Sequence, residues 1–240
     1  MASLPRPDRA TPPPQLLSVN AVAFDLDGTL VDTLADLHEA GRRMLVDLGR
    51  GEVAQERTRA YIGDGVDRLI KRLLTGEAGG EPDAGLFGRA RQSFLGHYAA
   101  VLLRESRPYP DALSTLAALR ARGFRLACVT NKPGAFTQPL LAGVGLSPAL
   151  DLVLSGDSLP RKKPDPLPLL HCASAFGIPP ARLLMVGDSA NDCLAARAAG
   201  CPVFCVPYGY RGAAGVQELD CDAIVATLSQ TLELISYTQS

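Results

Sequence analysis

The sequence has no excess of charge of either sign and no long apolar run. Its 24 lysines and arginines nearly balance its 25 aspartates and glutamates, so the net charge is −1. This balance gives no indication of a nucleic acid, an anionic membrane or a polyanion as partner. No apolar run approaches the roughly 20 residues that a membrane-spanning helix needs. We therefore expect a protein that binds neither nucleic acid nor membrane.

Paired cysteine motifs and an N-terminal secretion signal are missing as well. The six cysteines stand in apolar surroundings, and the two nearest in sequence, Cys201 and Cys205, are spaced too loosely for a zinc knuckle. This usage predicts buried free thiols in a reducing compartment, and hence a cytoplasmic protein. Residues 1–17 hold five of the 19 prolines and no continuous apolar stretch, which predicts a disordered tail.

Short apolar runs alternate with helical patterns along most of the 240 residues. The runs suit strands that are buried on both faces, as in a parallel sheet. The expected strands are 21–24, 126–129, 152–154, 183–186, 203–206 and 223–225, and the expected helices between them are 111–122, 133–144, 166–176 and 189–199. This alternation predicts an α/β fold with a doubly wound parallel sheet, whose site lies at the carboxyl ends of the strands.

One interval breaks the alternation of strands and helices. Between residues 34 and 103 only helical patterns occur, beginning with an apolar stripe over 34–48 and continuing over 66–74 and 86–103. The economical explanation is an all-helical domain at 34–106, inserted into a core of 18–33 and 107–240.

The strongest motif is Asp25-Leu26-Asp27-Gly28-Thr29, directly after the first expected strand. Two carboxylates that share a cleft need a cation or a proton to offset their repulsion. A hard divalent cation with oxygen ligands meets that need, and Mg²⁺ beside a phosphate is the usual case. One carboxylate could then attack phosphorus while the other handles the proton of the leaving group. Taken alone, the motif could also be a polar turn.

Three further motifs follow later strands. Thr130 and Asn131 offer a hydroxyl and backbone N–H groups at a helix N-terminus, where anions bind, and Lys163 offers a point charge for a phosphate. Asp188 ends a strand, and Asp192 follows on the same side of the next helix. Each could alone be a helix cap or a solvated loop. Together they fall at one expected edge of the sheet, which turn chemistry explains poorly.

In these four motifs the chain resembles the haloacid dehalogenase-like hydrolases, over residues 19–235. The resemblance implies that Asp25 is the nucleophile, which forms an aspartyl-phosphate. Asp27 would be the general acid and then the base. Mg²⁺ would be held by Asp25, the backbone carbonyl of Asp27, and Asp188. The acid at position 27 also argues against a transport ATPase and against a dehalogenase.

The resemblance assigns the remaining motif residues to the phosphate and to the surroundings of the metal. Thr130, the backbone of Asn131, and Lys163 would bind the phosphoryl oxygens. Asp192 would reach the metal through water or through another ligand. The helical insertion corresponds to the part that this family calls a cap, which closes over the cleft and selects the substrate.

Several segments, among them Gly63-Asp64-Gly65, resemble the phosphoglycolate phosphatases within this family. The resemblance implies hydrolysis of 2-phosphoglycolate to glycolate and phosphate, with Gly63, Asp64, Gly65 and Arg68 contacting this small phosphorylated carboxylate. Two residues depart from the pattern: Asp64 replaces the usual Asn, and Arg211 replaces the Asn that commonly follows Gly-Tyr.

A carboxylate at position 64 would repel a substrate carboxylate. We therefore expect Asp64 to point away from the substrate or to pair with Arg57, Arg68 or Lys71.

Two other functions stay open at this stage. The nearest is a phosphatase or phosphomutase for another small phosphate monoester, such as a sugar phosphate. A more distant one is an inactive family member that works as a binding module, which the presence of all four motifs disfavours. The sequence is compatible with a monomer or a homodimer.

Overall fold

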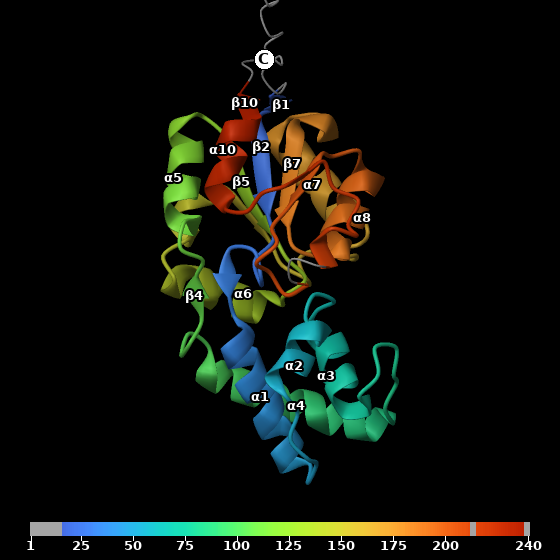
Figure 1. The fold of residues 1–240 in the computed structure, drawn as a ribbon. Coiled ribbons are helices and arrows are strands. Elements are labelled where there is room, and N and C mark those ends of the chain that lie inside the picture. Colours follow the sequence, from blue (N-terminus) through green and yellow to red (C-terminus); the bar gives the residue numbers. More distant parts are fainter. Residues whose placement is uncertain (1–15, 212–214, 238–240) are drawn as a thin grey trace, which may run out of the picture.

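The computed structural model describes residues 16–211 and 215–237, so most of the expected tail lies outside the described residues. Its centre is a six-stranded parallel sheet in the order β6-β5-β2-β7-β8-β9 (Figure 1). The strands are β2 (Ala21–Phe24), β5 (Arg125–Val129), β6 (Leu152–Leu154), β7 (Leu183–Gly187), β8 (Val203–Cys205) and β9 (Ala223–Ile224). The parallel sheet predicted from the short apolar runs is confirmed.

Helices cover both faces of this sheet, as Figure 1 shows. They are α5 (Ala112–Ala121), α6 (Gly134–Gly143), α7 (Leu167–Phe176), α8 (Ala190–Ala199) and α10 (Thr231–Leu234), with short 3-10 helices at Ser147–Ala149, Pro180–Arg182 and Leu228–Gln230. Side chains alternate between the faces of a strand. Val22 and Phe24 of β2 accordingly pack with α5 and α6, and Ala21 and Ala23 pack with α7 and α8. The doubly wound arrangement is confirmed.

Two strand pairs of the structure have no counterpart in the sequence analysis, and the second of them forms the stem described below. β1 (Leu17–Val19) pairs in parallel with β10 (Ile235–Tyr237). The placement of Leu17 in a disordered tail is therefore wrong. A strand of three residues shows no periodicity, and its partner lies at the other end of the chain, so the sequence carried no signal for this pair.

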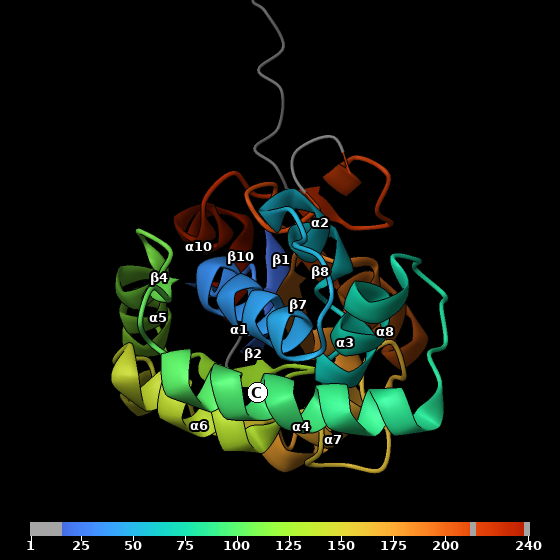
Figure 2. The same cartoon turned by 90° about the horizontal axis from the view of Figure 1, so that it is seen from below.

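A helical lobe, residues 34–106, stands below the sheet. It contains α1 (Leu34–Asp47), α2 (Gln55–Tyr61), α3 (Val66–Thr75) and α4 (Ala84–Val101), and α1 lies along α4 (Figure 2). Met44, Ile70 and Phe94 belong to its own hydrophobic cluster. The sequence analysis missed α2 because that helix buries only Thr58 and Tyr61. That this lobe works as a cap stays a prediction, taken up below.

The chain enters and leaves the lobe through a two-stranded stem. β3 (Val31–Asp32) and β4 (Arg107–Pro108) pair in antiparallel fashion. Just inside the lobe, the buried Asp36 carboxylate accepts hydrogen bonds of 2.9 Å from the backbone N–H groups of Glu105 and Ser106. The two crossings of the chain are therefore fastened to each other.

None of the helices in the described part of the chain combines the length and the apolar character that crossing a membrane requires.

Candidate active site

Three of the predicted motifs meet because their strands end at one level. The register pairs Phe24 of β2 with Cys128 of β5 and with Val186 of β7. Asp25 directly follows β2, Thr130 follows β5 and Asp188 follows β7, so all three lie at the carboxyl edge of the sheet. This is the edge at which open α/β sheets bind their ligands.

Lys163 lies between two carboxylates at this edge. Its Nζ is 2.9 Å from Asp25 Oδ1 and 2.6 Å from Asp192 Oδ1, and its side chain is 2% exposed. Burial alone would lower the pKa of Lys163, but the carboxylates of Asp192 and Asp25 raise it. Burial raises the pKa of Asp25 to about 7, although the Lys163 ammonium lowers it. The lysine therefore stays charged and offsets only part of the acidic cluster.

Asp192 is held by the start of α8. Its Oδ2 accepts hydrogen bonds from the backbone N–H of Ser189 at 3.0 Å and from the Ser189 hydroxyl at 2.7 Å, which completes a capping box. Because Oδ1 accepts a hydrogen bond from Lys163, both oxygens of Asp192 have partners.

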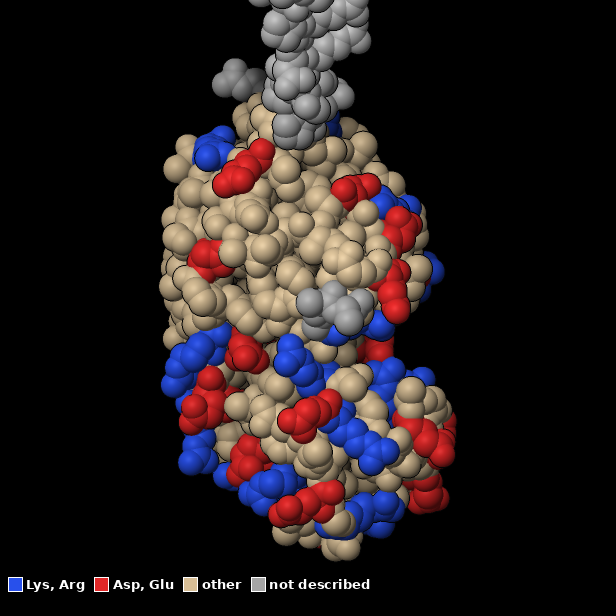
Figure 3. Space-filling model, viewed as in Figure 1, with Lys and Arg blue, Asp and Glu red and all other residues tan. Residues whose placement is uncertain are grey.

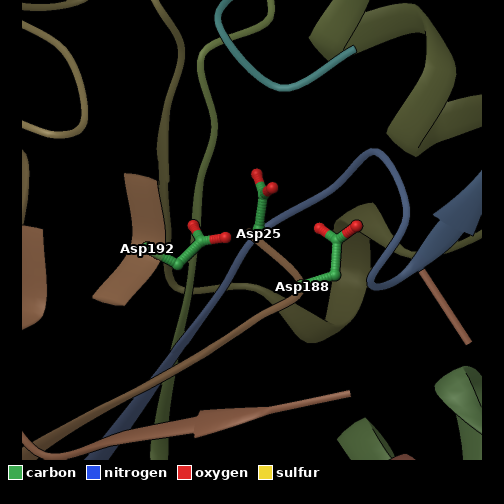
Figure 4. Close-up of side chains that lie close together, drawn as sticks. All are labelled: Asp25, Asp188 and Asp192. Carbon is green, nitrogen blue, oxygen red and sulfur yellow. The ribbon is translucent and has the colours of Figure 1, made fainter. Parts of the chain in front are cut away.

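Asp188 lies on the other side of Asp25 (Figure 4). Its Oδ2 accepts a 2.7 Å hydrogen bond from the backbone N–H of Tyr210. Gly28 has φ +90°, and a Cβ atom there would lie 2.6 Å from Asp188 Oδ2, so the turn after Asp25 requires glycine. Burial raises the pKa of Asp188 well above its usual range, and the carboxylates of Asp25 and Asp192 add to the shift.

The residues at this edge fit a divalent cation. Ligand oxygens of Asp25, Asp188 and Asp192 lie within 4.8 Å of one another, and all three residues are buried. With only Lys163 among them, the fully ionised cluster has an excess of two negative charges. Burial is the main cause of the raised pKa values of Asp25 and Asp188, and the neighbouring carboxylates add to it. A hard dication with oxygen ligands would remove the excess of negative charge.

Asp27 faces Lys132 rather than the three other aspartates. Lys132 Nζ lies 2.9 Å from Asp27 Oδ1 and 3.2 Å from Oδ2, and Oδ1 also accepts a 2.7 Å hydrogen bond from the Thr33 hydroxyl. Sequence reasoning missed Lys132, although it stands within the Thr-Asn-Lys-Pro motif. Its burial and its contact with Asp27 are visible only in the structure.

Asn131 connects the edge of the sheet with the helical lobe. Its Nδ2 donates to the carbonyl oxygens of Lys163 at 2.8 Å and of Gly63 at 3.0 Å. The neighbouring Thr130 is 4% exposed, and its Oγ1 accepts a hydrogen bond from the backbone N–H of Lys132. Thr130 and Asn131 therefore lie beside Asp25 and Lys163, as the motif order predicts.

A cavity of about 40 Å³ lies between this edge and the lobe, with room for only a few water molecules. It is lined from the core by Asp25, Asp27, Thr130, Asn131, Lys132, Pro133 and Phe136, and from the lobe by Leu37, Ile62, Gly63, Gly65, Val66, Leu69 and Tyr98. The nucleophile and the acid expected from the sequence thus open into the same small space.

The predicted lobe contacts divide into two groups. Gly63 and Gly65 line the cavity, whereas Asp64 and Arg68 are not among its lining residues. Gly65 has φ +87°, and a Cβ atom there would lie 3.1 Å from the carbonyl oxygen of Asn131 and 2.6 Å from Lys162 Nζ. Glycine therefore lets the lobe backbone approach the core closely.

Asp64 points to a second, larger cleft, and its predicted partners are wrong. Its carboxylate lies 2.5 Å from Arg72 and accepts a 2.7 Å hydrogen bond from Asn191 of the core. Burial works against ionisation, but the Asn191 hydrogen bond and the Arg72 charge lower the pKa of Asp64.

The three expected partners of Asp64 bind elsewhere. Arg68 and Lys71 pair with Glu81, and Arg57 donates to the Gly76 carbonyl. The loop turns the Asp64 carboxylate toward Asn191 of the core. Among the nearby cationic side chains of α3, Arg72 is the one that pairs with it there.

The second cleft, of about 400 Å³, collects arginines from both parts of the molecule. Arg59, Arg72 and Arg211 line it together with Asp64. Arg59 donates a 2.6 Å hydrogen bond to the carbonyl of Gly209, which draws the lobe to the segment before Arg211. Arg211, the second departure from the subfamily pattern, is exposed and does not line the small cavity.

Comparison with known proteins places the chain in a family. The model of the haloacid dehalogenase-like hydrolases matches residues 19–200, and the chain belongs to this family. It is 53% identical to the phosphoglycolate phosphatase of Nitrosospira multiformis, over 91% of this chain and 96% of that protein. It is 50% identical to the phosphoglycolate phosphatase of Thiobacillus denitrificans, over 92% and 97%.

A solved structure agrees with these relatives. The crystal structure of a predicted phosphoglycolate phosphatase from Haemophilus somnus superposes with a TM-score of 0.82 at 35% identity, covering 90% of this chain and 97% of that one. The resemblance to phosphoglycolate phosphatases, and with it the expected enzyme class of phosphoric monoester hydrolases, is thereby confirmed.

Proposed function

We propose that this haloacid dehalogenase-like hydrolase is a Mg²⁺-dependent phosphatase, which converts 2-phosphoglycolate to glycolate and phosphate. One observation carries the reaction type: Asp25 and Asp27 open into one small cavity, each beside a buried lysine. The relatives described above support the choice of substrate.

Asp25 is the nucleophile in this proposal. Lys163 holds Oδ1 at 2.9 Å, which leaves Oδ2 to attack phosphorus in line with the leaving oxygen. The new bond between Asp25 and phosphorus gives an aspartyl-phosphate, while the bond between phosphorus and the glycolate oxygen breaks. Water then attacks the same phosphorus and restores the Asp25 carboxylate.

Asp27 moves the protons of both steps. In the first it gives a proton to the departing glycolate oxygen, and in the second it takes one from the attacking water. The Thr33 hydroxyl and Lys132 hold its carboxylate at the cavity wall. This keeps it from turning toward Asp25, so nucleophile and acid stay separate.

Thr130, the backbone N–H of Asn131, and Lys163 are the proposed ligands of the phosphoryl oxygens. All three lie beside Asp25, and the ammonium of Lys163 is buried, where its charge is screened little by water. Phosphoryl transfer asks mainly for this kind of positioning and charge neutralisation.

The proposed Mg²⁺ would be held by Asp25, the backbone carbonyl of Asp27, and Asp188. When bound, it supplies positive charge for the phosphoryl oxygens and for the carboxylates. Asp192 already uses both oxygens on Lys163 and Ser189, so its proposed part is to fix Lys163.

The size of the cavity supports a substrate with few atoms beyond its phosphoryl group. The small cavity is narrow, which favours a compact substrate, although Asp27 and Asp188 also line the larger second cleft. The lobe would act as a cap that excludes competing water from the aspartyl-phosphate. Five of the six cysteines are buried and none forms a disulfide among the described residues, which supports the proposed cytoplasmic location.

A substrate panel with detection of free phosphate tests this function. We expect 2-phosphoglycolate to give the highest kcat/KM in a panel that includes ethyl phosphate, glucose 1-phosphate and glucose 6-phosphate. Chelation by EDTA should abolish turnover, and added Mg²⁺ should restore it. Faster release of phosphate from a sugar phosphate would overturn the substrate. Isomerised sugar phosphate without free phosphate would identify a mutase, and activity that survives chelation would contradict the metal.

A further inference from the structure

We propose that Lys132 recognises the carboxylate of the substrate and is thereby the main determinant of specificity. This inference rests on the proposed function and names the group that would select phosphoglycolate among phosphate monoesters.

Lys132 is the only cationic side chain among the described residues that line the small cavity. The residue is 4% exposed, and it comes from the core rather than from the lobe, where the sequence suggested that substrate contacts would lie. A cation that is kept in so small a space is costly unless an anion meets it. Asp27 meets that need while its carboxylate is ionised.

The reach of Lys132 matches the shape of the substrate. In the proposed reaction Asp27 contacts the oxygen that joins phosphorus to glycolate, and the carboxylate carbon of glycolate lies two bonds from that oxygen. Lys132 Nζ is 2.9 Å and 3.2 Å from the two Asp27 oxygens, so it stands at the neighbouring position. An ammonium has three N–H donors, and the Asp27 carboxylate leaves at least one of them for a ligand.

Tyr98 of the lobe provides a second polar group at the same place. The Lys132 ammonium lies 4.7 Å from the centroid of the Tyr98 ring, whose other neighbour is the ring of Phe136 at 4.8 Å. The Tyr98 hydroxyl is buried and faces the Lys132 ammonium, and among the described residues no other side chain or backbone group partners it. Buried hydroxyls normally have a partner, and a ligand carboxylate in the cavity would be one.

Three other cations near the boundary between lobe and core are engaged away from the small cavity. Arg72 pairs with Asp64, Arg68 pairs with Glu81, and Lys162 donates to the Asp64 carbonyl at 2.8 Å. Lys163 is enclosed by Asp25 and Asp192 and is assigned to the phosphoryl group. Among the described residues that line the small cavity, Lys132 is therefore the cation available to a second anionic group of the substrate.

The test compares two substrates that differ in the carboxylate alone. Ethyl phosphate carries a methyl group where 2-phosphoglycolate carries its carboxylate. In the wild type we expect kcat/KM to be much higher for 2-phosphoglycolate. In Lys132→Met this preference should fall by roughly 10- to 100-fold, as expected when a charge-assisted hydrogen bond in a buried site is lost. The ratio does not depend on the fraction of active protein, so partial misfolding of the variant does not affect it.

The matched control is Lys71→Met, which removes a lysine from the surface of the lobe, where it pairs with Glu81. Its substrate preference should equal that of the wild type. If Lys132→Met lowers kcat for both substrates equally and keeps the preference, Lys132 serves Asp27 alone and the inference is wrong. If the wild type itself shows no preference for 2-phosphoglycolate, the proposed function fails before the inference is tested.

A binding measurement gives an independent result without turnover. 3-Phosphonopropionate has the shape of 2-phosphoglycolate but no bond that hydrolyses, and propylphosphonate lacks its carboxylate. By titration calorimetry we expect the wild type to bind the first more tightly than the second, and Lys132→Met to bind the two about equally. Tyr98→Phe should lose a smaller part of the difference, roughly three- to tenfold. An undiminished difference in Lys132→Met would overturn the proposal.

Discussion

The two walls of the small cavity are made from different kinds of residue. The core wall contains all of its charged side chains, Asp25, Asp27 and Lys132. The wall from the helical lobe contributes the backbone at Gly63 and Gly65, apolar side chains and Tyr98. In the proposed reaction, residues of the core therefore transfer the protons and the phosphoryl group, while the lobe shapes the cavity and excludes water from it.

On the outside of the molecule the contrast is reversed. Figure 3 shows charged side chains crowded over the lobe and sparse on this face of the core. The lobe has 22 charged residues among its 73, and the rest of the chain has 27 among 167. Many lobe charges form exposed pairs, such as Arg91 with Asp67, which add little to stability. Charges therefore crowd the surface of the lobe, whereas the charges that line the small cavity come from the core.

The strongest test of the contrast between the core wall and the lobe wall is to neutralise the proposed nucleophile in the core. Asp25→Asn should lower kcat/KM for 2-phosphoglycolate by roughly 10⁴-fold or more, because the amide cannot form the acyl-phosphate bond. Phosphate release measures the loss. Asp220→Asn, which changes an exposed aspartate paired with Arg197, should keep wild-type activity. Substantial turnover by Asp25→Asn would contradict covalent catalysis by the core.

Removing the buried lysine of the core should cost both activity and stability. Lys163→Met leaves Asp25 and Asp192 without their shared cation, so we expect a loss of about 3–5 kcal/mol in the free energy of unfolding. Turnover should fall by roughly 10²- to 10³-fold. Urea denaturation in EDTA measures the first effect. The surface variant Lys71→Met should change the free energy of unfolding by less than about 0.5 kcal/mol. An equal change in the two variants would mean that the buried lysine is no different from a surface one.

A change at the lobe wall should act through closure instead of through chemistry. Gly65→Ala places a methyl group at φ +87° against Lys162 and the Asn131 carbonyl. We expect the lobe to seat less closely and kcat/KM to fall about tenfold, with roughly 1–3 kcal/mol of backbone strain. Steady-state kinetics and thermal unfolding measure the two effects. The control is Gly96→Ala in α4, where a Cβ atom meets open space and helix propensity improves. If both variants behave alike, the seam at Gly65 does not matter for closure.

The smallest effect is expected at the lobe surface. Arg68→Ala removes a side chain that pairs with Glu81 outside the small cavity, so kcat/KM should change by less than about twofold. A parallel assay of Arg89→Ala, at another exposed position of the lobe, sets the background. A large rise in KM for Arg68→Ala alone would restore Arg68 as a substrate contact and weaken the contrast between the two walls.

The sequence predicted the parts of the site that depend on strand ends. Asp25, Thr130 and Asp188 each follow a short apolar run, and parallel strands bring such positions to one edge whatever the details of packing. Lys163 stands in a loop rather than at a strand end. The family resemblance implied its place beside the phosphoryl group, and its contact with Asp192 was not predicted.

The misses concern contacts that no local pattern encodes. Lys132 meets Asp27 from 105 positions along the chain, and nothing in its neighbourhood indicates the direction of its side chain. Tyr98 was expected only as part of a helix, and its place above Lys132 depends on how the lobe sits on the core. Asp64 was expected to point away from the substrate or to pair with Arg57, Arg68 or Lys71; it does lie outside the small cavity, but its partners are Arg72 and the core residue Asn191. The direction of a side chain and the way the lobe sits on the core are properties of the tertiary structure, and composition does not determine them.

The paired stem of β3 and β4 bears on how fast the enzyme can work. The two crossings of the chain lie side by side and are joined by the hydrogen bonds of Asp36. We expect such a stem to bend about one axis and to resist sliding or twisting. If the lobe acts as the proposed cap, release of glycolate requires this stem to bend, and the rate of bending then sets an upper limit on turnover.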